Sequence, residues 1–152
     1  MSTVRVTIEI QAPIEKVWET IMDPSRFKDW VTIHRAIKHL SEEPSKQGAT
    51  MEQVLHMRGV SFTVHWKLVD VSAPNMAEWV GKGPAHSRAR IKYSLSSNGE
   101  RATTFDYTNE FTPPGGWLGS AASRVVVGAA SEREAHTSLS RLKALLEREN
   151  AA

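Results

Sequence analysis

Hydrophobic and polar residues alternate along much of this chain, which is the pattern of strands that bury one face. Segments 4–10 and 60–68 show it most clearly, with an apolar side chain at every second position. Turn signals such as Asn98-Gly99 separate the alternating segments and favour hairpins. We therefore predict an antiparallel sheet of about seven strands. The predicted strands are 4–10, 31–40, 51–57, 60–68, 76–82, 85–95 and 104–111.

Three other segments have the features of helices. From Ile14 the apolar positions recur at three- and four-residue intervals, which predicts an amphipathic helix of about ten residues. Asp23-Pro24 is a helix-start signal and predicts a short second helix over 27–30. The segment 117–149 lacks proline and predicts one helix of roughly 30 residues, or roughly 45 Å. Strands followed by a separate helix indicate an α+β fold.

The predicted long helix has an uneven apolar surface. Its first half carries small residues in the segments 119–123 and 128–131, whereas its second half carries Leu139, Leu142 and Leu146. Small side chains fill little of the space between a helix and a curved sheet. The residues alone are equally compatible with close helix–sheet contact and with a cavity.

Composition excludes several classes of site. The chain has 152 residues, which is the size of a single domain, and we assign residues 1–152 to one domain. It has no cysteine, so disulfides, thiolate catalysis and cysteine-based metal sites are excluded. Nineteen Lys and Arg against 17 Asp and Glu leave a net charge of +2, a field too weak to favour nucleic acid as a partner.

The sequence indicates neither a membrane segment nor a signal peptide. No apolar run approaches the roughly 18 residues that a membrane-spanning helix needs. Residues 1–5 lack the charged and apolar regions of a signal peptide. We therefore expect a cytoplasmic protein without stable membrane insertion.

A basic strip lies along the predicted strand 85–95. Arg88, Arg90 and Lys92 share one face of that strand. We interpret the strip as a solvated outer face opposite the acidic Asp106 and Glu110 of the next strand, because cross-strand pairs of opposite charge are favourable. No aromatic residues interleave with these cations on the same face, so nucleic-acid binding is not indicated.

Several polar and aromatic residues share the parity of the apolar, inward positions. By strand parity Gln53, Trp66, Tyr93, Tyr107 and Asn109 face the core side of the sheet. Buried amides need hydrogen-bond partners, which a ligand, a buried water or the backbone can supply. We therefore name these residues as candidate ligand-binding residues. Trp79 joins them if Ala77, Trp79 and Gly81 point inward.

Candidate acid–base groups are few. The chain has six histidines, but no pair has the spacing of metal ligands, so we expect no metal. His34 and His39 are five positions apart and point to opposite faces of a strand. Tyr107 and His136 are the candidate acid or base, since His136 lies one turn before Leu139 on the long helix. No carboxylate has a clear inward parity.

Two stretches of the sequence resemble a known superfamily. They are residues 6–18 (VTIEIQAPIEKVW) and residues 23–30 (DPSRFKDW). Both resemble the opening of START-like proteins, the SRPBCC or helix-grip superfamily, and in particular its polyketide cyclase/dehydratase-like family. The later turn at Gly99 and the terminal helix fit the same order of elements. The resemblance implies a helix-grip α+β fold, in which a curved antiparallel sheet wraps around a long C-terminal helix.

The resemblance also implies a deep apolar pocket between the sheet and the terminal helix. We expect it to bind one small hydrophobic molecule, such as a lipid or a polyketide, without a cofactor. Ala122 and Val126, in the first half of the helix, complete the expected lining. One alternative is a polyketide cyclase, aromatase or dehydratase that uses acid–base chemistry. Another is a non-catalytic partner protein of the chaperone co-activator kind. A homodimer is compatible with the sequence, although no residue specifies one.

Overall fold

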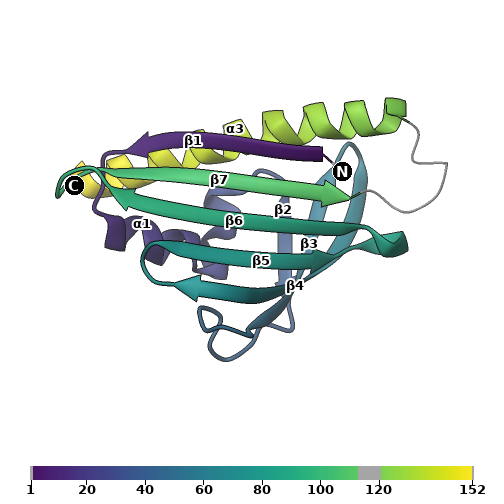
Figure 1. Cartoon of the computed structure of the whole chain (residues 1–152), viewed down its shortest axis with the longest axis horizontal. Coiled ribbons are helices and arrows are strands. Elements are labelled where there is room, and N and C mark those ends of the chain that lie inside the picture. Colours follow the sequence, from purple (N-terminus) through teal and green to yellow (C-terminus); the bar gives the residue numbers. More distant parts are fainter. Residues whose placement is uncertain (1, 113–120, 152) are drawn as a thin grey trace.

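The computed structural model describes the backbone of residues 2–112 and 121–151, and the side chains of 3–112 and 132–151. It is an α+β fold with one antiparallel sheet and one long helix (Figure 1). The strands are β1 (Ser2–Ile10), β2 (His34–Lys38), β3 (Thr50–Met57), β4 (Val60–Ser72), β5 (Met76–Lys82), β6 (Arg88–Ser97) and β7 (Thr103–Thr112). The helices are α1 (Ile14–Ile21), α2 (Phe27–Trp30) and α3 (Ala121–Ala151), with short 3-10 turns at Pro24–Arg26 and Pro84–His86.

The seven strands form a single sheet in the order β1-β7-β6-β5-β4-β3-β2. Strands β2 to β7 form a meander of successive antiparallel pairs, and β1 adds to the β7 edge with Val6 opposite Tyr107. The sheet curls, and α3 runs along it beside β1, so that the C terminus lies near the end of β1 and α1 (Figure 1). This is the helix-grip arrangement that the sequence predicted.

The second half of α3 is held to the sheet by a leucine stripe. Leu139, Leu142 and Leu146 are at most 1% exposed. Full burial of one such side chain stabilises the fold by about 1.5–3 kcal/mol.

Polar contacts at the β1–α1 connection fix the same end of α3. The backbone N–H of Gln11 donates to Glu147 Oε2 at 2.8 Å, and Lys143 Nζ donates to the Glu9 carbonyl at 2.7 Å. Arg26 forms an ion pair with Glu149 at 2.8 Å. The last turns of α3 are thus positioned by both apolar packing and directional bonds.

Three of the predicted strands are wrong at their ends, and one of them is the strand predicted over 60–68, which continues to Ser72 as β4. The strand predicted over 31–40 is confined to His34–Lys38, because the N–H of Val31 bonds back to the Phe27 carbonyl at 2.8 Å and His39 has a φ of 50°. The strand predicted over 85–95 begins only at Arg88, because Ser87 Oγ donates to the Pro84 carbonyl at 2.8 Å and closes a tight turn.

The predicted helices need smaller corrections. The first spans eight residues rather than about ten. The long one is 31 residues and begins at Ala121, while 117–120 lie outside the described residues. The Asp23 cap is confirmed, since its carboxylate accepts from the Ser25 N–H at 3.0 Å. Within the described residues, no helix combines the length and hydropathy needed to cross a bilayer.

The basic strip lies on the outer face of the sheet, but its ion pairs differ from the prediction. Arg90 lies across from Glu110, yet it pairs with Glu78 of β5 at 3.1 Å. Asp106 is instead held by Arg5 of β1 at 2.6 Å, and this hydrogen-bonded pair keeps the pKa of the Asp106 carboxyl below its usual range. The cross-strand partners therefore come from β1 and β5, on either side of the β6–β7 hairpin.

Gly81 of β5 makes room for an indole ring. It lies opposite Trp66 in the β4–β5 register, and a Cβ at this position would be 2.7 Å from the Trp66 ring and 2.7 Å from Val64 Cγ1. Real carbon atoms do not approach so closely, so a larger residue would force the ring or the strand to move. The absence of a side chain at position 81 thus allows Trp66 to lie flat against β5.

We predict that Gly81→Ala lowers the free energy of unfolding by about 1–3 kcal/mol through overpacking. Urea denaturation measures the change. Ser96→Thr, which adds one methyl group at an exposed position of β6, is the matched control and should change stability by less than about 0.5 kcal/mol. Equal stability of the Gly81→Ala and parent proteins would contradict this account of the packing.

Candidate cavity between the sheet and the long helix

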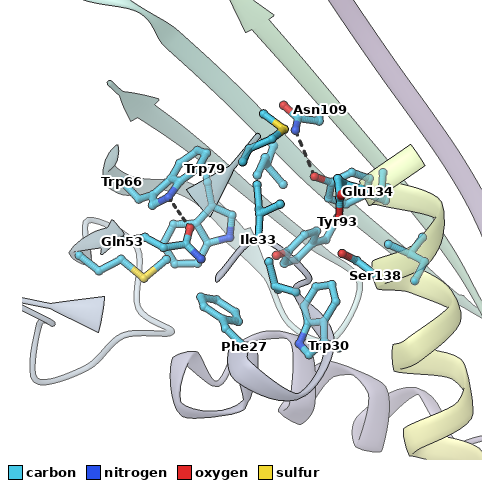
Figure 2. A pocket seen from close by; sticks show the side chains of 17 residues that line it. Phe27, Trp30, Ile33, Gln53, Trp66, Trp79, Tyr93, Asn109, Glu134 and Ser138 are labelled. Atoms are coloured by element: carbon cyan, nitrogen blue, oxygen red, sulfur yellow. Dashed lines mark hydrogen bonds between the residues drawn. The ribbon is translucent and has the colours of Figure 1, made fainter. Parts of the chain in front are cut away.

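A cavity of about 100 Å³ lies between the inner face of the sheet, α2 and α3. Strands β3 to β7 supply one wall, and the helices supply the other (Figure 2). The lining is mainly apolar and aromatic, with a few polar side chains distributed among the strands and α3. The 17 lining residues are Phe27, Trp30, Val31, Ile33, Met51, Gln53, Met57, Trp66, Trp79, Ile91, Tyr93, Tyr107, Asn109, Glu134, Ala135, Ser138 and Leu139.

Strand parity brings the sequence-predicted residues together at this cavity. Gln53, Trp66, Tyr93, Tyr107 and Asn109 all belong to its lining. The conditional assignment of Trp79 is also resolved, because Ala77 and Trp79 are buried and Trp79 lines the cavity. Adjacent strands are in register here, with Tyr93 opposite Tyr107 and Ile91 opposite Asn109. Whether these residues contact a ligand stays a prediction.

Of the three candidate residues on α3, the structure describes only the side chain of His136. The side chains of Ala122 and Val126 lie outside the described residues. The structure does not place His136 at the cavity: its side chain is 60% exposed and lies 4.0 Å from Glu132. His136 is not among the residues that line the cavity, although Glu134 and Ala135 just before it are. The prediction of His136 as a cavity acid or base is therefore corrected.

Gln53 is held by a chain of hydrogen bonds that leads away from the cavity. The Trp66 indole N–H donates to Gln53 Oε1 at 2.9 Å, and Gln53 Nε2 lies 3.0 Å from His34 Nδ1. An indole can only donate, so the Gln53 oxygen must accept and its amide nitrogen must donate to His34. His34 Nδ1 is therefore the acceptor, and the proton of the neutral ring is on Nε2.

His34 is thus a structural partner of the cavity wall that strand parity did not reveal. Its ring packs edge-on against Phe27 with centroids 5.8 Å apart, and burial lowers the pKa of this imidazole. Protonation would place a donor at Nδ1 against the donor of Gln53. The stability contributed by neutral His34 is present above the ordinary histidine pKa and is lost as the pH falls through the lowered value.

We predict that His34 populates the Nε2–H tautomer and stays neutral below the usual titration range of histidine. Long-range nitrogen–proton NMR spectra at several pH values distinguish the two tautomers and the imidazolium. Gln53→Leu, which removes the donor to Nδ1, should release this tautomer preference. A His34 ring with its proton on Nδ1 in the parent protein would contradict the assigned chain.

The tyrosine pair forms the polar part of the opposite wall. Asn109 Nδ2 donates to the Tyr107 hydroxyl at 3.2 Å, and the Tyr93 and Tyr107 rings lie 6.1 Å apart (Figure 2). Burial raises the pKa of Tyr107 to about 12, although the hydrogen bond from Asn109 opposes part of that increase. Burial, followed by the nearby Tyr107, raises the pKa of Tyr93 still further. Both hydroxyls are therefore proton donors rather than bases at neutral pH.

We predict that the folded protein shows little tyrosinate absorbance up to about pH 11, because its only two tyrosines have raised pKa values. The unfolded chain ionises near 10, so the stability from neutral Tyr107 is present below about pH 10 and is lost as the pH approaches about 12. Ultraviolet titration and denaturation at alkaline pH measure both effects. Tyr107→Phe should weaken the alkaline loss of stability. A folded-state tyrosinate transition centred near pH 10 would refute this prediction.

Two buried polar atoms near the cavity have no hydrogen-bond partner among the residues that the structure describes. They are the Oδ1 atom of Asn109 and the Nε1 atom of Trp30, whose residue is 2% exposed. Buried polar atoms are nearly always hydrogen-bonded in folded proteins. Both residues line the cavity, so a ligand can supply a donor for Asn109 and an acceptor for Trp30.

The structure adds a polar group on α3 that the sequence analysis missed. Glu134 and Ser138 line the cavity from consecutive turns. The Thr32 hydroxyl donates to Glu134 Oε2, and the Thr32 N–H donates to Ser138 Oγ at 3.1 Å. The leucine stripe carried the necessary signal: extended back from Leu139 at helical spacing, it passes through Ala135 and brings positions 134 and 138 to the cavity edge.

Comparison with known proteins defines the family. The family model described as "Polyketide cyclase / dehydrase and lipid transport" matches residues 1–147. The chain belongs to this family. Similar solved structures include the Zhui aromatase/cyclase from a Streptomyces species, with 19% identity, a TM-score of 0.75, and coverage of 96% of this chain and 93% of that one. Another is TTHA0849 from Thermus thermophilus, with 16% identity, a TM-score of 0.76, and coverage of 93% and 94%.

The curated relatives of this family member match a smaller part of the chain. Toxin MT0934 and Toxin Rv0910 of Mycobacterium tuberculosis are each 24% identical to it over 91 residues. The match covers 60% of this chain and 63% of each toxin, so it spans less than two thirds of those proteins. At these identities the solved structures establish the shared fold, and the family association is with lipid transport and polyketide cyclisation.

Proposed function

We propose that residues 1–152 form one domain that binds a single small, mainly apolar molecule in the cavity beneath α3. The observation that carries this proposal is the buried Oδ1 atom of Asn109, an acceptor in the cavity wall that has no partner within residues 3–112 and 132–151. Such an atom destabilises a folded protein by about 1–3 kcal/mol, and a ligand donor would remove that penalty. The family's association with lipid transport supports the same function.

The size of the cavity indicates a compact ligand. An engineered cavity of about 150 Å³ accepts benzene, and this one is about 100 Å³. We therefore expect a molecule, or the inserted end of a longer molecule, about the size of one ring. Burial of its apolar surface against Trp66, Trp79 and Ile91 would supply about 25 cal/mol per Å².

Adjacent polar groups would orient this ligand. Tyr107 accepts a hydrogen bond from Asn109, so its own hydroxyl proton remains to be donated. Asn109 Oδ1 meanwhile remains to accept. A ligand hydroxyl can satisfy both groups at once, because a hydroxyl donates one hydrogen bond and accepts others.

We predict that fluorobenzene binds the cavity and that Ala135→Leu lowers its affinity by about tenfold or more, because the larger side chain fills the space beneath α3. Fluorine NMR measures the affinity. Ala144→Leu, an exposed position on the same helix, is the matched control and should bind like the parent. Failure of the parent protein to bind fluorobenzene, or equal affinity in the Ala135→Leu variant, would count against the proposal.

A second candidate function is acid–base catalysis on an enolisable ketone in the same cavity. Glu134 favours it, since a carboxylate on the cavity wall can exchange a proton with a substrate. Tyr107, with its pKa raised to about 12, is suited to donate a hydrogen bond to a carbonyl rather than to act as a base. Turnover of such a ketone, as opposed to binding alone, distinguishes this function from the first.

A further inference from the structure

We infer that Glu134 makes the cavity selective for ligands that carry a hydroxyl or ammonium group and makes it discriminate against carboxylates. This inference rests on the proposed binding function and deepens it by naming the chemical class of the ligand. Lipids and polyketides include both acids and alcohols, so the charge of the cavity wall decides between them.

Glu134 is held in place at the cavity by its neighbours. Its Oε2 atom accepts from the Thr32 hydroxyl, and that hydroxyl lies 3.2 Å from Ser138 Oγ. Thr32 is fixed in turn, because its N–H donates to Ser138 at 3.1 Å. Figure 2 shows Glu134 and Ser138 on the side of α3 that faces the cavity. No described residue donates to the second carboxylate oxygen, Oε1, so this atom remains to accept from a ligand.

The charge of Glu134 is not balanced within the described part of the chain. It is the one residue among the described lining that carries a formal charge at neutral pH. No described lysine, arginine or histidine lies within 4.0 Å of its carboxylate. His34, whose Nδ1 atom accepts from Gln53 and whose pKa is lowered by burial, adds no positive charge at neutral pH.

Asn109 gives the opposite wall the same preference. Its Oδ1 atom is a second acceptor that has no partner among the described residues, so each wall of the cavity offers an acceptor that a ligand donor can satisfy. A ligand alcohol or ammonium group supplies such a donor. A ligand carboxylate supplies no donor, and it would meet the like charge of the half-buried Glu134 in a mainly apolar cavity.

The test uses four ligands with one ring and nearly equal size: ethylbenzene, 2-phenylethanol, 2-phenylethylamine and phenylacetate. Calorimetric titration at neutral pH measures their affinities. We expect the parent protein to bind the alcohol and the amine at least about tenfold more tightly than phenylacetate. Glu134→Gln keeps the shape and an acceptor for Thr32 but removes the charge. We expect this variant to bind the amine about tenfold more weakly and phenylacetate more tightly, with little change in its affinity for ethylbenzene.

Two further variants make the result specific to the charge at position 134. Glu132→Gln removes a charge two residues away on a side chain that is 65% exposed, and it should leave all four affinities unchanged. Glu134→Asp keeps the charge and should keep the preference for donors. If Glu134→Gln does not fold, retention of the preference in Glu134→Asp and its loss in Glu134→Ala provide the same comparison.

The outcomes separate this inference from the proposed function. Tightest binding of phenylacetate by the parent, or an unchanged preference in Glu134→Gln, would overturn the role of Glu134 while leaving the cavity a binding site. If the parent bound none of the four ligands, ethylbenzene included, the proposed function itself would fail.

Discussion

The cavity depends on how unevenly α3 packs against the curved sheet. In its last turns Leu142 and Leu146 are fully buried against the sheet, and bonds from the β1–α1 connection fix that end. Further toward the start of the helix, the small Ala135 and Ser138 line the cavity together with Glu134 and Leu139, opposite Trp66 and Trp79 of the sheet. Because the docked end fixes the distance between helix and sheet, the space cannot close by tighter packing, and it remains as an apolar hollow.

The polar groups around this hollow fall into two kinds. Gln53 is bonded on both sides, by the indole of Trp66 and the imidazole of His34, so its role is to hold the wall. Within the described part of the chain, Asn109 and Glu134 each form a hydrogen bond through one atom, and Asn109 Oδ1 and Glu134 Oε1 accept from no residue. A chain whose polar side chains served packing alone would not leave acceptors unpaired at the cavity. This difference supports a ligand with a hydrogen-bond donor. That ligand class is narrower than the one the family description gives.

Most of the cavity residues could be predicted from strand parity, because a side chain on a strand can point only to one face of the sheet or to the other. Once the apolar face was assigned, Gln53, Tyr93 and Tyr107 had to point inward, and the structure places them at the cavity. The inward face of α3 was harder to predict, because a helix can be rotated about its axis by any angle. Small residues also do not show clearly which face is buried. His136 was therefore placed on the wrong side and Glu134 was missed. The ends of β2 and β6 depend on local turn bonds, from Val31 N–H to the Phe27 carbonyl and from Ser87 Oγ to the Pro84 carbonyl, which the alternation of apolar and polar residues does not reveal.

The most direct test of the central claim is a crystal structure determined under xenon pressure, since xenon enters dry apolar cavities without needing a polar partner. The account predicts xenon density, or a retained small molecule, between Trp66, Trp79 and the face of α3 that carries Ala135. Density showing neither, with side chains closed over that space, would contradict the claim that α3 leaves a hollow beneath it.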